Sequence, residues 1–280
     1  MVDTTNKLSI WQQNINKLLT CQYNLISSNH LANMGVGIIA LQEPAINPFG
    51  LTIAARDWMP IYPTPHGTTP ARTWAVMLIH SNISTDTWTQ LDFPSSNVTV
   101  TQIMGNWGKL TIFNIYNDCN NNDIIKLLSN YYSRNQTQLE HIDTGIANVI
   151  WLGDFNYHHP LWDDPNDNCL FTPEAMDAAE VLIEVIADIG LELALPSGTP
   201  MHQYNVTKSW SRLDQVFLSE HSDHMLISCD MWTDLHGILI DHLPIIILLD
   251  LLVEPAAKTP YPNFREVNWE EFKMTLETQL

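Results

Sequence analysis

The feature that most constrains the fold of this chain is a series of short apolar runs, each of which adjoins a small polar cluster. Runs such as LSIW, GVGIIA and NVIWL have the length and the branched side chains of buried β-strands. Polar groups repeated at strand ends can converge at one edge of a sheet, so we expect a single site there. The clusters are Gln13-Asn14, Gln42-Glu43, Tyr116-Asn117, Gly153-Asp154-Phe155-Asn156, Arg212-Leu213-Asp214 and Asp241-His242.

Strands separated by few helices are typical of two mixed β-sheets packed face to face, with helices outside, which is an α/β fold. Further strand-like runs are TWAVMLIH, WTQLDF, VTVTQIM, KLTIFNIY, RLDQVFLS, MLISCDMW and ILIDHLPIIILL. Helices are expected from Lys17 to about Asn29 and over NNNDIIKLLSNYYSRN. A third helix should begin at Thr172-Pro173, with threonine as its cap, and end at Gly190.

The chain is expected to form one large domain and a tail. Its 280 residues, 45% of them apolar, supply a core for a domain that we place at residues 1–253. The proline-rich segment from Glu254 to Tyr261 is expected to be a linker. Asn268-Trp269-Glu270-Glu271 resembles a helix capping box, so residues 254–280 are interpreted as a linker and the start of a helix leading to a missing downstream region.

Several features predict an intracellular protein that is neither secreted nor bound to a membrane. The N-terminal segment MVDTTNKLSI lacks the apolar core of a secretory signal. The apolar run from Leu243 to Val253 is too short to cross a bilayer and is broken by Asp250. The four cysteines form no CxxC pair, which argues against a disulfide framework or a zinc ribbon.

The formal net charge of −19, with only 12 lysines and arginines, weighs against tight, non-specific binding of nucleic acid. Surfaces that bind phosphate are usually basic. An acidic chain can still carry a local cationic site, and a bound Mg²⁺ ion adds positive charge there. The charge therefore disfavours a robust DNA-binding module more than it disfavours a metal-dependent enzyme.

The clusters contain side chains suited to phosphate chemistry. Asp154 and Asn156 are two apart on a strand, so their side chains point the same way and can reach one ligand. His242, next to Asp241, can contact a phosphate or move a proton, and Asp214 can fix its tautomer. Hard oxygens with a single imidazole fit Mg²⁺-assisted phosphate chemistry better than zinc or redox chemistry.

Each motif also has a purely structural interpretation. GDFN alone can be a turn that closes a strand, and His242 alone can be a structural histidine. Glu43 lies either at a site or at a solvated strand end, because a carboxylate inside a strand is costly, and Tyr116 can simply pack. Adjacent histidines rarely converge on one ion, so we interpret the HHPLW segment at His158 and His159 as a packed loop.

Together and in this order, the motifs QQN, LQE, IYN, GDFN, SRLD and DHLP resemble the endonuclease/exonuclease/phosphatase superfamily. These Mg²⁺-dependent phosphodiesterases include apurinic endonucleases and DNase I, and the match extends from about Leu8 to Leu252. NIYN, GDFNYHHPLW and DHLPI look most like the endonuclease domain of non-LTR (LINE-type) retrotransposons. NFREVNWEEF resembles the segment ahead of their reverse transcriptase.

The resemblance implies a DNase I-like, four-layer α/β sandwich. It also implies DNA as a partner, the nucleus as the compartment, and a reverse transcriptase region that is absent from this chain. Glu43 would hold Mg²⁺, with Mn²⁺ as a substitute, while Asn14 would lie close by and Asp241 near the metal. Two departures point away from abasic-site repair: Asn16 stands where apurinic endonucleases tend to have aspartate, and YNDC lacks their Y-x-P-N ending.

The resemblance further implies a catalytic role for five residues. Asp154 would orient and deprotonate the attacking water, and Asn156 would hold the phosphate. His242, oriented by Asp214, would contact the scissile phosphate, to which Tyr116 would donate a hydrogen bond.

Three functions are weighed. The first, and the expected one, is a phosphodiesterase that nicks DNA as in non-LTR retrotransposition. The second is a phosphoesterase of the same fold that acts on a small phosphoester of the inositol phosphate or sphingomyelin type, which the acidic charge slightly favours. The third is a non-catalytic relic of a mobile element, against which the full set of site residues argues.

Overall fold

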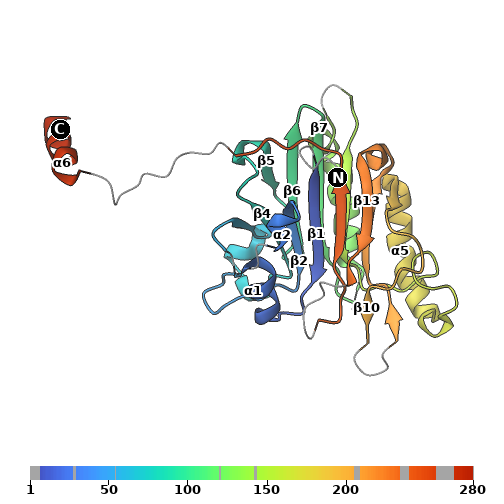
Figure 1. Cartoon of the computed structure of the whole chain (residues 1–280). Helices are drawn as coiled ribbons and strands as arrows, with labels where there is room; N and C mark the ends of the chain where they lie inside the picture. The colour runs from blue at the N-terminus through green and yellow to red at the C-terminus, as the bar shows by residue number, and fades with distance from the viewer. Residues whose placement is uncertain are drawn as a thin grey trace.

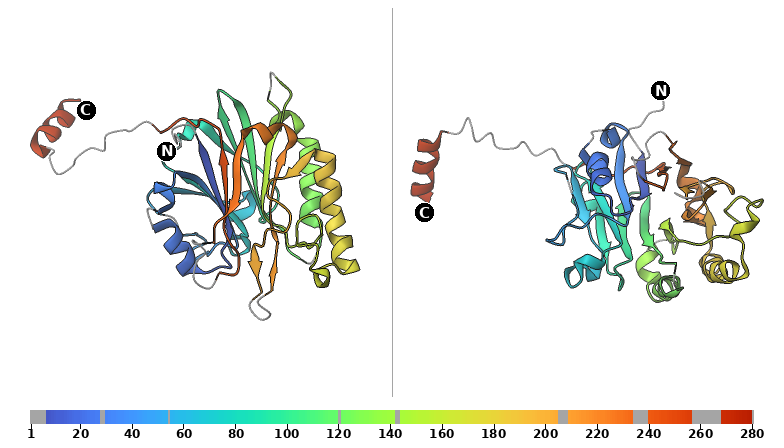
Figure 2. Two further views of the ribbon diagram at one scale, coloured as in Figure 1. Left: turned by 45° about the vertical axis from the view of Figure 1, so that its right-hand side comes forward. Right: turned by 90° about the horizontal axis from the view of Figure 1, so that it is seen from below.

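The main body is two six-stranded sheets packed face to face between two layers of helices (Figures 1 and 2). This arrangement confirms the predicted four-layer α/β sandwich. The computed structural model describes residues 7–27, 30–53, 55–119, 121–141, 144–204, 209–233, 240–256 and 268–279.

Each sheet is mixed. In the first sheet β1 is parallel to β2, in the second β7 is parallel to β8, and the other neighbouring strands are antiparallel. The first sheet has the order β13 (Leu226–Met231), β14 (Ile245–Leu249), β1 (Leu8–Asn14), β2 (Val36–Gln42), β4 (Ala75–His80) and β3 (Trp58–Ile61). The second has the order β5 (Trp88–Leu91), β6 (Val98–Gly105), β7 (Gly108–Tyr116), β8 (Asn148–Asp154), β12 (Asp214–Ser219) and β9 (Leu191–Leu193). A separate pair is formed by β10 (His202–Gln203) and β11 (Trp210–Ser211).

The central strands are buried on both faces, which explains why they read as continuous apolar runs. Ile10 of β1 and Ile150 of β8 lie in the core between the two sheets. The next residue of each strand, Trp11 or Trp151, belongs to a separate core on the helix side of its sheet. Polar side chains can therefore reach solvent mainly at the strand ends.

The helices cover the outer faces of the sheets. The outer core of the first sheet includes residues of α1 (Leu19–Ser27), and that of the second includes residues of α3 (Asp123–Arg134) and α5 (Pro173–Ile189). As predicted, the Thr172 hydroxyl caps α5 by accepting from Ala175 N, and Gly190 ends the helix in a left-handed conformation with φ of 73°. Two short helices are α2 (His30–Asn33) and α4 (Gln136–Leu139).

The tail contains α6 (Trp269–Gln279), and Asn268 accepts a hydrogen bond from Glu271 N as a helix cap does. Of the linker expected from Glu254 to Tyr261, residues 257–261 lie outside the described residues. Before these residues, Pro255 still forms a β-bridge with Ile83 of the main body. No helix in the described part of the chain is long and apolar enough to cross a membrane.

The structure differs from the expected strand over ILIDHLPIIILL. β14 begins only at Ile245, and His242 makes an isolated bridge to His202 instead of joining a sheet. Pro244 explains the late start, because proline cannot donate a hydrogen bond to a neighbouring strand. The sequence pattern also does not predict the short strands β3, β9, β10 and β11.

Candidate active site

The register of the strands brings distant residues to one edge of the paired sheets. Asn14 ends β1 and Glu43 directly follows β2, while Tyr116 and Asp154 end β7 and β8. Because these are parallel pairs, their carboxyl ends meet at the same edge. β12 runs the opposite way and starts there, with Asp214 paired opposite Asp154.

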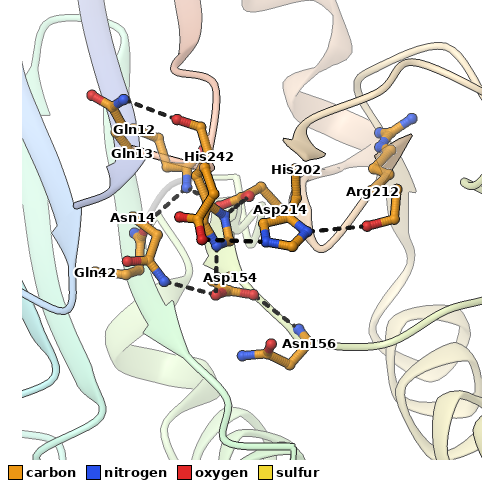
Figure 3. A network of polar contacts seen from close by, with 12 residues as sticks. Gln12, Gln13, Asn14, Gln42, Asp154, Asn156, His202, Arg212, Asp214 and His242 are labelled. Carbon is orange, nitrogen blue, oxygen red and sulfur yellow. Dashed lines mark hydrogen bonds and ion pairs between the residues drawn. The ribbon is translucent and has the colours of Figure 1, made fainter. Parts of the chain in front are cut away.

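One polar network joins residues from both sheets (Figure 3). The Asn14 amide Nδ2 donates to Asp154 Oδ2 at 2.9 Å and to Glu43 Oε1 at 3.3 Å. His242 Nε2 lies 4.0 Å from the same Asp154 oxygen, and His242 Nδ1 lies 2.6 Å from Asp214 Oδ2. Asp154 therefore sits between Asn14 and His242 at the centre of the network.

The contact with Asp214 determines the state of His242. Because a carboxylate oxygen accepts, Nδ1 carries a proton and Nε2 faces Asp154. Burial favours the neutral ring, but the charge and hydrogen bond of Asp214 outweigh it and raise the pKa of His242 to about 9. At neutral pH the imidazole is a cation that can donate from Nε2 to an anionic oxygen.

Asp154 has the properties of a general base. Its burial and the nearby charge of Asp214 raise the pKa of Asp154 to about 7, although His242 opposes the shift. The main-chain N–H of Asn156 donates to Asp154 Oδ1 at 3.1 Å, so the carboxylate is fixed from two sides. A carboxylate with a pKa near neutrality can take up a proton efficiently at physiological pH.

The GDFN motif forms a tight turn as well as a site. Gly153 has φ of 141°, and a Cβ atom there would lie 1.9 Å from the carbonyl oxygen of Ile115 on β7. Asn156 also has a positive φ, 55°, and its Nδ2 donates to the carbonyl of Asn117 at 2.8 Å. The Asx turn of the structural interpretation thus holds Asp154 in place.

Tyr116 and Glu43 lie together beside Asp154. The Tyr116 side chain is hydrogen-bonded to Glu43, and burial, followed by the negative charges of Glu43 and Asp154, raises the pKa of Tyr116. The hydroxyl therefore stays protonated and donates. In this structure it contacts the carboxylate that the sequence assigns to the metal.

Three buried amides to which the sequence assigns no role at the site support Asp214, directly or through one another. Gln12 Nε2 donates to Asp214 Oδ1 at 2.8 Å and to Gln42 Oε1 at 2.7 Å. Gln42 Nε2 then donates to Asn114 Oδ1 at 2.5 Å, which links the two sheets. The sequence carries a signal for them, namely an amide within each of the apolar runs LSIWQQN, VGIIALQ and KLTIFNIY. Because a buried amide without partners is costly, each of these amides implies polar partners nearby.

His202 is another functional candidate that the sequence did not reveal. Its ring centre is 4.6 Å from that of His242, and its Nε2 is 3.7 Å from Asp241 Oδ2. No local pattern marks it, because its position depends on the long-range bridge to His242. The ligand atoms of His202, Asp241 and His242 all lie within 4.8 Å of one another and could hold a metal ion.

The two possible metal sites differ in chemistry. Two imidazoles and a carboxylate, as at His202 and its neighbours, are ligands typical of zinc and related ions. The carboxylate of Glu43 beside Asn14 instead presents hard oxygens, which Mg²⁺ prefers. Asp241, which the sequence assigns to the metal, belongs to the first group by its contact with His202.

The charge around the site fits a divalent cation. The carboxylates gathered at this edge are those of Glu43, Asp154, Asp214 and Asp241. The nearby guanidinium of Arg212 is buried and donates instead to the carbonyl oxygens of Pro196 and Leu195. An ion bound at Glu43 would offset the excess negative charge.

The HHPLW segment is a packed loop in the structure. His158 lies 3.3 Å from Asp163 through Nδ1 and 3.0 Å from the Tyr204 hydroxyl through Nε2. His159 donates its main-chain N–H to the same Asp163 carboxylate at 3.1 Å. Asp163 also accepts from Arg212 N at 2.7 Å, so the loop anchors the segment that leads into β12 and Asp214.

Residues 110–246 match a protein-family model described as endonuclease-reverse transcriptase. No curated protein sequence matches the chain. The endonuclease domain of TRAS1, a telomere-specific non-LTR retrotransposon, superposes with a TM-score of 0.65 at 16% identity, covering 87% of this chain and 99% of that chain.

Two further solved structures share the fold. An AP endonuclease from Leishmania major gives a TM-score of 0.68 at 11% identity and covers 88% of this chain and 89% of its own. The 3′ phosphatase NExo from Neisseria, bound to a product DNA hairpin, gives 0.59 at 16% identity and covers 85% of this chain and 98% of its own. At such identities the likeness shows the fold alone.

Proposed function

We propose that this chain, whose residues 110–246 match the endonuclease-reverse transcriptase model and whose fold is DNase I-like, is a metal-dependent phosphodiesterase that nicks DNA. The observation that carries the proposal is the position of Asp154 between Asn14 and His242. There a carboxylate with a pKa of about 7 lies 4.0 Å from an imidazole that Asp214 keeps protonated. This pairing supplies a base and a cationic donor at one point.

The geometry supports hydrolysis by a water molecule. The water oxygen forms a bond to phosphorus while its proton passes to Asp154, and the bond to the leaving oxygen breaks. His242, oriented by Asp214, donates from Nε2 to a phosphate oxygen and offsets the charge that develops there. Asn156 would hold the phosphate through its side-chain amide, whose Nδ2 donates to the Asn117 carbonyl in the structure.

Mg²⁺, with Mn²⁺ as a substitute, is the proposed cofactor. Glu43 would hold it, with Asn14 close by and Asp241 at the margin of the site. The bound ion would stabilise negative charge on the phosphate as a Lewis acid. Tyr116 would donate its hydrogen bond either to Glu43, as in the structure, or to the phosphate.

DNA is the proposed substrate, and the known relatives support it. The Neisseria relative is bound to a DNA hairpin, and TRAS1 is a retrotransposon. A groove of about 830 Å³ adjoins the site and is lined by Lys17 and by Pro44, the residue after Glu43. A reverse transcriptase region as partner and the nucleus as compartment follow from the same proposal.

A comparison of substrates tests this function. Purified protein should convert supercoiled plasmid to the open circular form in the presence of Mg²⁺ or Mn²⁺, and EDTA should stop the reaction. Inositol phosphates, assayed beside the plasmid, should release no phosphate. Hydrolysis of inositol phosphates without nicking at low salt would instead establish the small-phosphoester function, which the net charge of −19 favours.

A further inference from the structure

The main chain of Glu43 adopts an unfavourable conformation that its neighbours hold in place. Its φ is 47°, in the left-handed region that costs a residue with a side chain more than glycine. Glu43 N donates to the carbonyl of Trp74 at 2.8 Å, and Lys17 N donates to the carbonyl of Glu43 at 2.8 Å. Both peptide groups that flank Glu43 are therefore fixed.

The side chains of the same two residues form a stack. Lys17 Nζ lies 3.7 Å from the centre of the Trp74 ring, a cation–π distance. Trp74 in turn stacks on Tyr116, with ring centres 5.1 Å apart and an angle of 9° between the planes. Because Tyr116 hydrogen-bonds Glu43, the contacts form a closed ring that starts and ends at Glu43.

The backbone of Lys17 strengthens this view. Lys17 also has a positive φ, 55°, a conformation in which glycine would be free of strain. Its side chain is exposed, so burial does not account for a lysine in this strained conformation. The contact of its ammonium group with the Trp74 ring does account for it.

We propose that Trp74 and Lys17 are positioning residues for the metal-binding carboxylate. Trp74 holds the Tyr116 ring so that its hydroxyl meets Glu43, and Lys17 packs over the Trp74 ring. The pair thereby sets the direction of the Glu43 carboxylate without touching metal or substrate. This inference rests on the proposed function, because the metal role of Glu43 belongs to it.

The binding of Mn²⁺ to the protein without DNA, measured as loss of the free-ion EPR signal, tests the proposal. Trp74→Ala should weaken Mn²⁺ binding roughly tenfold, the usual effect of removing a residue that orients a ligand. Trp74→Phe, which keeps the stack, should bind nearly as well as the wild type. Lys17→Met, on the exposed surface, should give a smaller loss in the same direction.

Trp88→Ala is the matched control. Trp88 is half-buried like Trp74, but it begins β5 and pairs with Ile103. Ile103 in turn pairs near the start of β7, at the end of that strand away from Tyr116. Its loss should leave Mn²⁺ binding unchanged. If Trp74→Ala fails to fold in thermal melts, Lys17→Met and Trp74→Phe decide the matter.

Two results would overturn the inference. One is unchanged Mn²⁺ affinity in both Trp74→Ala and Lys17→Met, and the other is no Mn²⁺ binding by the wild type. The outcome is separable from the proposed function. If Trp74→Ala binds Mn²⁺ more weakly but the wild type does not nick DNA, the positioning role stands and DNA is rejected as the substrate. If Trp74→Ala and Lys17→Met bind Mn²⁺ and nick DNA normally, the positioning role is rejected and the proposed function stands.

Discussion

At the residue scale, the chemistry depends on the protonation of two neighbouring side chains, Asp154 and His242. Asp154 must lose its proton to act as a base, and its pKa is raised to about 7, so the nicking rate should rise as pH passes through about 7. His242 must keep its proton, and its pKa is raised to about 9, so the rate should fall as pH passes through about 9. A bell-shaped pH profile of kcat/KM is therefore expected.

The profile is measured from initial nicking rates in buffers of constant ionic strength and saturating Mg²⁺. Thermal melts at each pH separate loss of activity from unfolding. A rate that stays constant across the neutral range would remove Asp154 as the base.

Nearly isosteric substitutions address the same pair more directly. His242→Gln should lower kcat by roughly 10²–10⁴-fold, because the cationic donor is lost while the packing is kept. Adding Asp154→Asn to it should lower kcat little further, since the two groups act as a unit. Single-turnover rates and melting temperatures of the single and double variants provide the measurement. Independent, multiplying losses would show that the residues do not cooperate.

At the scale of the strands, the site depends on the close approach of β7 and β8. Gly153→Ala should destabilise the fold by about 3 kcal/mol or more, because it combines backbone strain with a clash against the Ile115 carbonyl. Gly35→Ala is the control. Gly35 also has a positive φ, 76°, but a Cβ there would meet nothing within 4 Å, so only strain of about 1–2 kcal/mol is expected.

Urea unfolding curves for the two variants measure this difference in the free energy of unfolding. Equal losses for Gly153→Ala and Gly35→Ala would mean that the two strands can separate at little cost, and the account of the GDFN turn would be wrong.

The elements also show how far the sequence predicts the structure. Strands such as β1 and β8 are recognisable because burial on both faces demands unbroken apolar runs. The start of β14 is set by Pro244, which the apolar run around it hides, and β10 and β11 have only two residues each, too few for an alternating pattern. His202 is missed because its bridge to His242 joins segments far apart in sequence, while Gln12 carries a signal that only the paired sheets explain.

At the scale of the whole molecule, the order of six weak motifs predicts the fold well, because each marks the end of a strand that must reach one edge. Which carboxylates share an ion is less predictable. Asp241 belongs to the DHLP motif, which assigns it to the metal, but in the structure it lies beside His202. That contact depends on the path of a segment distant in sequence. The net charge is equally plain in the sequence, yet its effect on DNA depends on local geometry.

The net charge of −19 gives a prediction at this scale. Long-range repulsion should make binding to duplex DNA weak, so that it depends on a few cationic contacts with phosphates. Rising NaCl competes for those contacts, and nicking should therefore fade as NaCl rises. An oligonucleotide with an abasic site should be cut no faster than its intact counterpart. Nicking that persists in high salt, or that prefers the abasic site, would contradict this picture.

The central claim is that the carboxylate of Asp154 drives metal-dependent cleavage of a phosphodiester bond. The most direct measurement is the rate of supercoiled-plasmid nicking in the presence of Mg²⁺, compared between the wild type and Asp154→Asn. This substitution keeps the shape of the side chain and removes its ability to act as a base. We expect the wild type to nick the plasmid and Asp154→Asn, provided that it melts cooperatively, to nick it roughly 10²-fold or more slowly. Equal rates for the two proteins would contradict the central claim.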